Sequence, residues 1–392
     1  MTQVDFPVFD ADNHYYEAVD AFTRHMDPKL AKRGVQWGEI NGRTRILVGG
    51  RIFRFIPNPT FDPVSRPGAL DEYFRGRNPR GQDVRDAFGE LEPIRPEYRD
   101  HDARINVMDK QGLEGCFLFP TLGVGVEEAL RTDIDALYAS LHAFNEWLDE
   151  DWGFHYQQRI FGAPMLSLLD ERRAVEELRW VIERGVRIVC LRTGPLITPS
   201  GGRSPGDPIY DEFWGLIEDA GVLVGYHSGD AGYDRYANDW GASSEMEAFR
   251  ADPFKRVILG DRPIFDTMAA LVCHGVFNRF PRIKVATIES GSSWVQGLIK
   301  SLKKTYGQLP QLFPEDPIEA FFRNVWVAPF FEDDIPALAD HISVEHILMG
   351  SDWPHAEGLP EPADYIRDLP GFSAEAVRKI MHDNAQGLIS VT

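Results

Sequence analysis

The chain has 392 residues and a formal net charge of −20, because 61 acidic residues outnumber 41 lysines and arginines. That excess argues against general binding to nucleic acid or to an anionic membrane surface. No uncharged apolar run approaches the roughly 18 residues of a membrane span, and the first residues lack the features of a signal peptide. The cysteines, Cys116, Cys190 and Cys273, fit neither a disulfide framework nor a zinc knuckle, so we expect a cytoplasmic protein.

The first predicted strand covers residues 6–12 and runs into polar residues at its end. Asp10, Asp12 and His14 are spaced two apart, and alternate side chains of a strand share one face. Two carboxylates and an imidazole on one face are costly to bury unless a positive group lies beside them. A divalent metal ion is the simplest such group.

Residues 20–100 form a separate pattern, which predicts an insertion on the rim of the fold. Residues 35–40 and 43–48 read as a hairpin with a tight Asn-Gly turn, and residues 51–56 read as a third strand. We expect residues 35–100 to pack over the mouth of the site as a lid. Residues 51–81 hold six arginines against three acids, which suits an anionic substrate, surface salt bridges or a subunit contact.

After residue 100, short apolar runs alternate with longer amphipathic stretches. The runs predict seven further strands, at 115–120, 160–166, 186–191, 222–227, 283–289, 325–328 and 346–350. The stretches predict helices at 102–111, 134–152, 171–184, 207–220, 267–280, 294–306, 333–342 and 374–389. Eight strands alternating with helices predict a single α/β domain over residues 1–392, a (β/α)8 TIM barrel. An open doubly wound sheet is the alternative, but it usually carries a glycine-rich turn after its first strand.

Ionisable residues collect where these strands end, at the barrel edge that carries chemistry in such folds. The predicted metal ligands are Asp12, His14, His227, Glu289 and Asp352, and the predicted catalytic residues are Asp352, His355 and Arg192. Asp352 would also accept a proton from water, and His355 would donate one to the leaving group. Arg192 would clamp the anionic substrate through two hydrogen bonds.

Four segments together carry a family resemblance: residues 9–14, 225–229, 275–291 and 350–355. In order and spacing they resemble the amidohydrolase superfamily, in the branch of aminocarboxymuconate-semialdehyde decarboxylase and the aromatic-acid decarboxylases. The resemblance implies a distorted (β/α)8 barrel, a bound divalent metal and often a homodimer.

Three positions depart from the pattern of that family. Asp12 stands where the first motif commonly has His, Glu289 stands where a His commonly follows the sixth strand, and Arg192 replaces a possible carbamylated Lys. The ring therefore has two histidines and two or three carboxylates, and such oxygen-rich sites favour hard metal ions. We expect zinc, manganese or iron, with one or two ions per chain.

The first functional hypothesis is hydrolysis or non-oxidative decarboxylation of a small or medium organic acid. The alternative is a non-haem iron oxygenase on the same barrel, in which Tyr16 or Glu17 completes an iron pair and an acyl thioester is the substrate. A catalytically inactive binding protein is a third possibility, which the cost of keeping buried charges disfavours.

Overall fold

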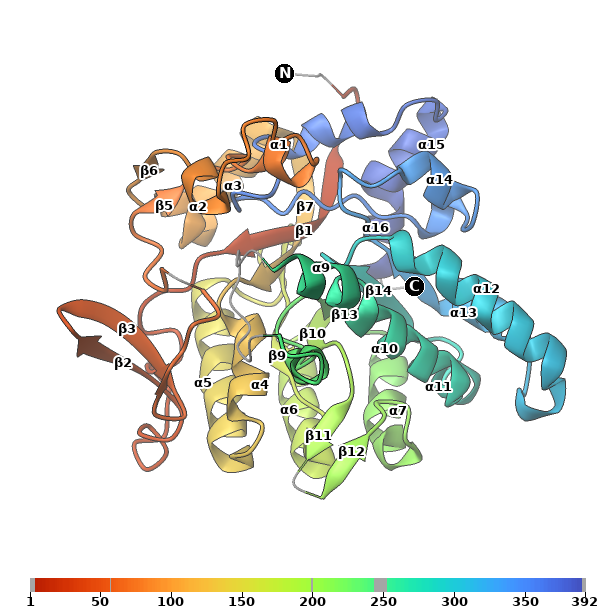
Figure 1. Ribbon diagram of the computed structural model, residues 1–392, viewed down its shortest axis with the longest axis horizontal. Coiled ribbons are helices and arrows are strands. Elements are labelled where there is room, and N and C mark those ends of the chain that lie inside the picture. Colours follow the sequence, from red (N-terminus) through yellow and green to blue (C-terminus); the bar gives the residue numbers. More distant parts are fainter. Residues whose placement is uncertain (1–3, 57, 199, 243–251, 390–392) are drawn as a thin grey trace.

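The computed structural model describes residues 4–56, 58–198, 200–242 and 252–389. Eight of their strands pair in parallel and form two sheets with helices packed outside them (Figure 1). The first sheet has the order β1 (Val8–Tyr15), β7 (Leu113–Pro120), β8 (Ile160–Gly162). The second has the order β15 (Val325–Val327), β14 (Lys284–Ile288), β13 (Leu223–His227), β10 (Ile188–Arg192), β9 (Met165–Leu166). These strands are almost wholly buried, as parallel strands covered on both faces are.

Backbone hydrogen bonds continue from one sheet to the other through the segment between β8 and β9. The amide of Ala163 donates to the carbonyl of Leu118 at 3.0 Å, and the amide of Cys190 donates to the carbonyl of Pro164 at 2.9 Å. The predicted strand at 160–166 is therefore divided into two short strands that serve different sheets.

The other edges of the two sheets meet through the segment that was predicted as the eighth strand. The amide of Ala11 donates to the carbonyl of Met349, and the amide of Leu348 donates to the carbonyl of Val327, both at 2.8 Å. Residues 346–350 nevertheless form only an isolated bridge there, so the prediction of a regular strand was wrong. The segment still delivers Asp352 to the end of β1.

Helices follow the strands largely as predicted: α3 (His101–Gln111), α5 (Ile134–Asp151), α6 (Glu171–Glu183), α7 (Asp211–Ala220), α12 (Ser293–Gln308), α14 (Ile335–Ala339). The predicted helix at 267–280 is two helices, α10 (Arg262–Cys273) and α11 (Val276–Arg279), because Gly275 lies between them at φ 70°. The last predicted helix is divided into α15 (Ala374–Arg378), a π-helical turn and α16 (Asn384–Ile389). Several elements were not predicted from the sequence: α4 (Val126–Leu130), α8 (Asp234–Asn238), α9 (Pro253–Leu259), α13 (Pro317–Asn324) and the hairpin of β11 (Leu196–Thr198) and β12 (Gly201–Arg203).

The insertion begins with the predicted hairpin, β2 (Val35–Ile40) and β3 (Arg43–Val48). Asn41 and Gly42 both have positive φ, as a tight primed turn requires. The third strand, β4 (Arg51–Ile52), is shorter than predicted. The hairpin lies beside α4 and α5 rather than over the site (Figure 1).

The rest of the insertion contains short elements: β5 (Val64–Ser65), α1 (Asp71–Phe74), α2 (Val84–Ala87), β6 (Leu91–Glu92). This part covers the end of the sheets where β1 and β13 terminate. None of the helices among the described residues is long and apolar enough to cross a membrane.

Candidate metal centre

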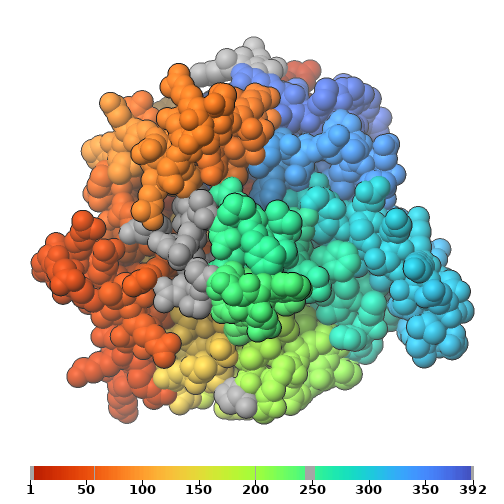
Figure 2. Space-filling view, viewed as in Figure 1, coloured from red at the N-terminus to blue at the C-terminus, as the bar shows by residue number. Residues whose placement is uncertain are grey.

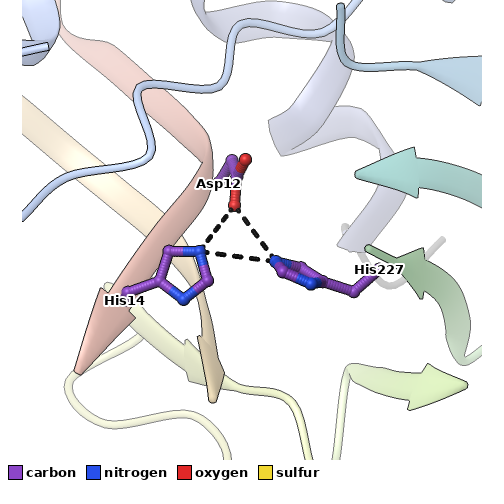
Figure 3. A group of neighbouring side chains, drawn as sticks. All are labelled: Asp12, His14 and His227. Atoms are coloured by element: carbon purple, nitrogen blue, oxygen red, sulfur yellow. Dashed lines mark hydrogen bonds and ion pairs between the residues drawn. The ribbon is translucent and has the colours of Figure 1, made fainter. Parts of the chain in front are cut away.

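Three predicted ligands meet at the ends of β1 and β13, as Figure 3 shows for Asp12, His14 and His227. The Asp12 Oδ1 atom lies 3.2 Å from Nε2 of His14 and 3.6 Å from Nε2 of His227. The two Nε2 atoms are 3.4 Å apart. Donor atoms at such separations can share one ion at roughly 2.0–2.3 Å from each.

Asp352 and Glu289 extend this group from the segments that follow β15 and β14. Oδ1 of Asp352 lies 3.3 Å from Nε2 of His14, and Oε2 of Glu289 lies 3.2 Å from Nε2 of His227. Both acids have positive φ, 57° and 47°, a conformation that non-glycine residues adopt at a cost and that is concentrated at functional sites. All five predicted ligands therefore converge, and Glu289 faces the histidines. These five side chains, Asp12, His14, His227, Glu289 and Asp352, are called the metal group.

The electrostatics of the carboxylates fit a divalent cation at this point. Burial raises the pKa values of Glu289 and Asp352 well above their usual range, and the charge of Asp352 adds to the effect on Glu289. Oδ1 of Asp12 is buried and accepts no hydrogen bond within the described part of the chain. A cation in contact with these oxygens would offset the cost of burying them, so the donor set fits the implied metal.

The pKa values of the two histidines shift in opposite directions. Burial would lower the pKa of His227, but the nearby carboxylates of Asp12 and Glu289 outweigh that effect and raise it. Burial lowers the pKa of His14 to about 3, with the nearby His355 adding to the effect. Burial would raise the pKa of Asp12, but the close imidazoles of His14 and His227 outweigh that effect and lower the pKa. Metal binding requires a neutral imidazole and an ionised carboxylate. The shifts of His14 and Asp12 favour these forms. The raised pKa values of His227, Glu289 and Asp352 mean instead that metal binding releases protons.

His355 is held between a ligand and the end of β7. Its Nδ1 atom is 2.6 Å from Oδ1 of Asp352, and its Nε2 atom is 2.9 Å from the hydroxyl oxygen of Thr121. That hydroxyl donates to the carbonyl of Tyr15 at 2.6 Å, so it must accept a hydrogen bond from Nε2 of His355. A second proton is consequently shared between Nδ1 and Asp352.

Sequence reasoning missed Thr121 and the way in which Glu17 holds it. One oxygen of the buried Glu17 carboxylate accepts hydrogen bonds from the backbone amides of Thr121, Leu122 and Gly123 at 2.8–3.0 Å. The only feature of the sequence that could have indicated a role for Thr121 in the site was its position directly after a buried strand. The carboxylate of Glu17 therefore fixes the loop rather than joining the metal ligands.

Asp10 does not belong to the metal group, so the prediction that it shares a face with Asp12 and His14 was wrong. A register irregularity between Asp10 and Asn13 interrupts the alternation of β1. The Asp10 carboxylate instead accepts hydrogen bonds from the amide and hydroxyl of Ser351 at 2.9 and 2.5 Å. It thereby ties β1 to the segment that carries Asp352.

The structure does not bring Arg192 to the group. Its guanidinium pairs with Glu127 at 2.8 Å and donates to the carbonyls of Ala231 and Pro195 at 2.9 and 3.0 Å. The side chain is buried and is not part of the cavity lining. The anion clamp expected from the sequence is therefore not the observed arrangement.

The metal group lies in a cavity of about 890 Å³ that the insertion helps to enclose. The lining includes residues from 55–91 together with Asp12, His14 and His227, which agrees with the lid expected from this part of the insertion. The six arginines of 51–81 are absent from the lining. Arg75, for example, pairs with Asp71 and Asp368 instead.

A second carboxylate group adjoins the first in the same cavity. Oxygens of Glu289, Asp352 and Glu357 lie within 4.8 Å of one another. Burial raises the pKa of Glu357, as it does for its two neighbours. Two of the three acids belong to both groups, so a cation at either position would act on the same carboxylates.

A known protein family matches most of the chain. The family model described as amidohydrolase matches residues 52–389. The crystal structure of amidohydrolase map2389c from Mycobacterium avium subsp. paratuberculosis K-10 is 49% identical, covers 99% of this chain and 100% of that one, and has a TM-score of 0.94.

More distant solved structures share the fold. A 2,6-dihydroxybenzoate decarboxylase from Rhizobium is 20% identical, covers 84% of this chain and 96% of that one, and has a TM-score of 0.57. A 5-carboxyvanillate decarboxylase from Novosphingobium aromaticivorans DSM 12444, with bound manganese, is 13% identical over 99% and 98% of the chains, with a TM-score of 0.59. The comparisons give no support to the oxygenase alternative. The chain belongs to the amidohydrolase superfamily.

Proposed function

We propose that this enzyme catalyses the non-oxidative decarboxylation of an aromatic carboxylic acid. The observation that carries the proposal is the convergence of Asp12, His14, His227, Glu289 and Asp352 on the floor of one cavity. Solved proteins of the same fold that act on 2,6-dihydroxybenzoate and 5-carboxyvanillate support the choice of an aromatic acid.

The proposal includes one divalent metal per chain, with manganese as the first candidate. Manganese is bound in the 5-carboxyvanillate decarboxylase, and carboxylate oxygens with imidazoles suit it. The ion would supply Lewis acidity toward the substrate carboxylate and a neighbouring oxygen. A second ion would use Glu289, Asp352 and Glu357.

The finer fold assignment is part of the same proposal. We infer that residues 1–392 form one distorted (β/α)8 barrel, with an insertion at about 20–100, since hydrogen bonds link both pairs of sheet edges. A homodimer is proposed from the family resemblance, and sedimentation analysis would test it.

The proton that replaces carbon dioxide is assigned to the pair of Asp352 and His355. When the carbon–carboxylate bond breaks, its electron pair stays on the ring carbon and takes up a proton. Nδ1 of His355 and Oδ1 of Asp352 lie 2.6 Å apart and share a proton, and both side chains face the cavity. The pair can therefore deliver that proton to the ring carbon. Thr121 keeps the imidazole in one orientation.

Hydrolysis is the second candidate, and the position of Asp352 favours it. Its Oδ1 atom lies among the ligand atoms, 3.3 Å from Nε2 of His14, where it can accept a proton from a water molecule once the Asp352–His355 pair has lost its shared proton. The two functions differ in product, because only decarboxylation releases carbon dioxide.

The test starts from protein whose metal has been removed and replaced with manganese. Carbon dioxide release from 2,6-dihydroxybenzoate and 5-carboxyvanillate is measured, with acid release from aryl esters and lactones followed in parallel. Decarboxylation that requires manganese and is abolished in Asp12→Asn supports the proposal. Metal-dependent ester or lactone hydrolysis without carbon dioxide release would establish the second candidate instead.

A further inference from the structure

The cavity is much larger than a single-ring aromatic acid requires. Its volume of about 890 Å³ corresponds to about 30 water molecules at roughly 30 Å³ each. The substrates named for the distant relatives are single-ring acids, which would leave a large part of such a space filled with water. The volume therefore has room for a second apolar group beside the ring that carries the carboxylate.

The wall contributed by the insertion is mainly apolar, although Asn58, Ser65 and Arg85 also line it, whereas the floor is ionic. Aromatic and aliphatic side chains from residues 55–91 line the cavity: Phe55, Phe61, Val64, Phe74, Phe88 and Leu91. Phe330 lines it from the loop after β15, and Ile264 lines it from α10. An apolar wall with a few polar groups at one end is the usual form of a site for an amphipathic small molecule.

Backbone contacts fix this apolar wall relative to the metal group. The amide of Gly68 donates to the carbonyl of His355 at 3.2 Å, and the amide of Leu70 donates to the carbonyl of Ala356 at 2.7 Å. The insertion is therefore anchored to the loop that carries a catalytic side chain.

The insertion also touches helix α9 on the other side of the mouth. The guanidinium carbon of Arg256 lies 5.7 Å from the centre of the Tyr73 ring. Figure 2 shows the surface of the insertion (orange) beside that of α9 (green) on one face of the molecule. The wall is thus held from two sides.

Two large side chains of the lining remain partly uncovered by protein. Leu91 is 53% exposed and Phe330 is 37% exposed, although both line the cavity. Apolar surface in this position gains free energy when an apolar group displaces water from it. A ligand of two rings supplies such a group.

We propose that the enzyme takes an aryl carboxylic acid with an apolar body larger than one aromatic ring, seated against residues 55–91. The position of the carboxylate rests on the proposed function, because it lies at the metal group. The apolar wall determines which acids are preferred and does not take part in the chemistry.

The test compares two probe acids, benzoate and biphenyl-4-carboxylate, by calorimetric titration of manganese-loaded protein. The second ring should tighten binding roughly 10-fold or more, the scale for burying an aromatic group. Leu91→Asn and Phe88→Ala should reduce that advantage several-fold, because biphenyl-4-carboxylate loses more affinity than benzoate does. Leu312→Asn is the matched control, because Leu312 is 67% exposed and outside the lining.

The outcomes separate this inference from the proposed function. Equal affinity for the two acids, with binding that is lost when manganese is removed, would overturn the larger substrate and leave the metal-held carboxylate standing. Failure of both acids to bind manganese-loaded protein would overturn both proposals. A preference for biphenyl-4-carboxylate that Leu312→Asn reduces as much as Leu91→Asn would show that the insertion wall is not its cause.

Discussion

The hydroxyl of Thr121 accepts a hydrogen bond from His355 at 2.9 Å while it donates its own proton to the carbonyl of Tyr15 at 2.6 Å. This arrangement determines which nitrogen of His355 carries a proton toward Thr121 and leaves the other nitrogen for Asp352. Glu17 holds Thr121 in place through the backbone. The end of β7, which carries no predicted ligand, therefore controls the orientation of the imidazole.

Thr121→Val should lower kcat about 10-fold or more with a small change in KM, the scale for partners that orient metal-site residues. Valine has nearly the same shape as threonine but cannot accept the hydrogen bond from His355. Thr121→Ser keeps the hydroxyl and should restore most of the rate. The pH profile of kcat/KM should shift in the valine variant only, and equal profiles would assign Thr121 a purely structural role.

Glu289→Gln should lower metal content or activity by about 10-fold or more, because the amide keeps the shape but loses the charge beside His227. Glu332→Gln is the matched control, since Glu332 lines the same cavity outside the groups that could hold a metal. Elemental analysis and turnover are the measurements. Full metal occupancy and turnover in Glu289→Gln would show that this carboxylate is structural.

Manganese should raise the thermal unfolding temperature of the protein, because an ion that binds only the folded state stabilises it, by about 2.7 kcal/mol at 100 times its Kd. Asp12→Asn should largely abolish the increase. Acidification should weaken metal binding at a higher pH than ordinary carboxylates would predict, since burial raises the pKa values of Glu289 and Asp352. Calorimetry with and without manganese at several pH values measures both effects, and a pH-independent Kd would contradict the second.

Glu17 should make the stability of the metal-free protein depend on pH. Burial raises the pKa of Glu17 to about 7 from 4.5, so the folded state binds the proton more tightly than the unfolded state does. Its contribution to stability is therefore complete below about pH 4.5 and is lost as the pH rises to about 7. Relative to Glu17→Gln, wild type should lose roughly 3 kcal/mol or less of unfolding free energy between pH 4 and pH 8. Urea denaturation of both proteins measures these free energies. The prediction would be refuted if the difference in unfolding free energy between wild type and Glu17→Gln were the same at pH 4 and pH 8.

Gly68→Ala should lower activity by displacing the insertion from the loop of His355. A Cβ atom at Gly68 would lie 2.6 Å from Pro360, and φ is 75° there. Gly76→Ala is the matched control, because Gly76 has φ 72° but nothing within 4 Å of the added atom. The control should lose only about 1 kcal/mol of stability and keep its activity. Equal turnover in the two variants would show that the position of the insertion does not affect catalysis.

The sequence by itself determined which residues reach the metal group. Asp12, His14, His227, Glu289 and Asp352 were identifiable because each follows a buried apolar run, and the ends of parallel strands meet at one edge. Strand and helix periods are local, so most elements were placed correctly. The hairpin at 35–48 was predictable for the same reason, since its turn depends on two adjacent residues.

Only the tertiary structure decided what surrounds that group. The irregularity in β1 turns Asp10 toward Ser351, Glu127 neutralises Arg192, and the backbone at Thr121 is held by Glu17. These contacts join residues that are far apart in the chain, and no local pattern encodes the distance between them. The same is true of the apolar wall, because the side chains of 55–91 line the cavity only after the insertion has folded back over the ends of the strands.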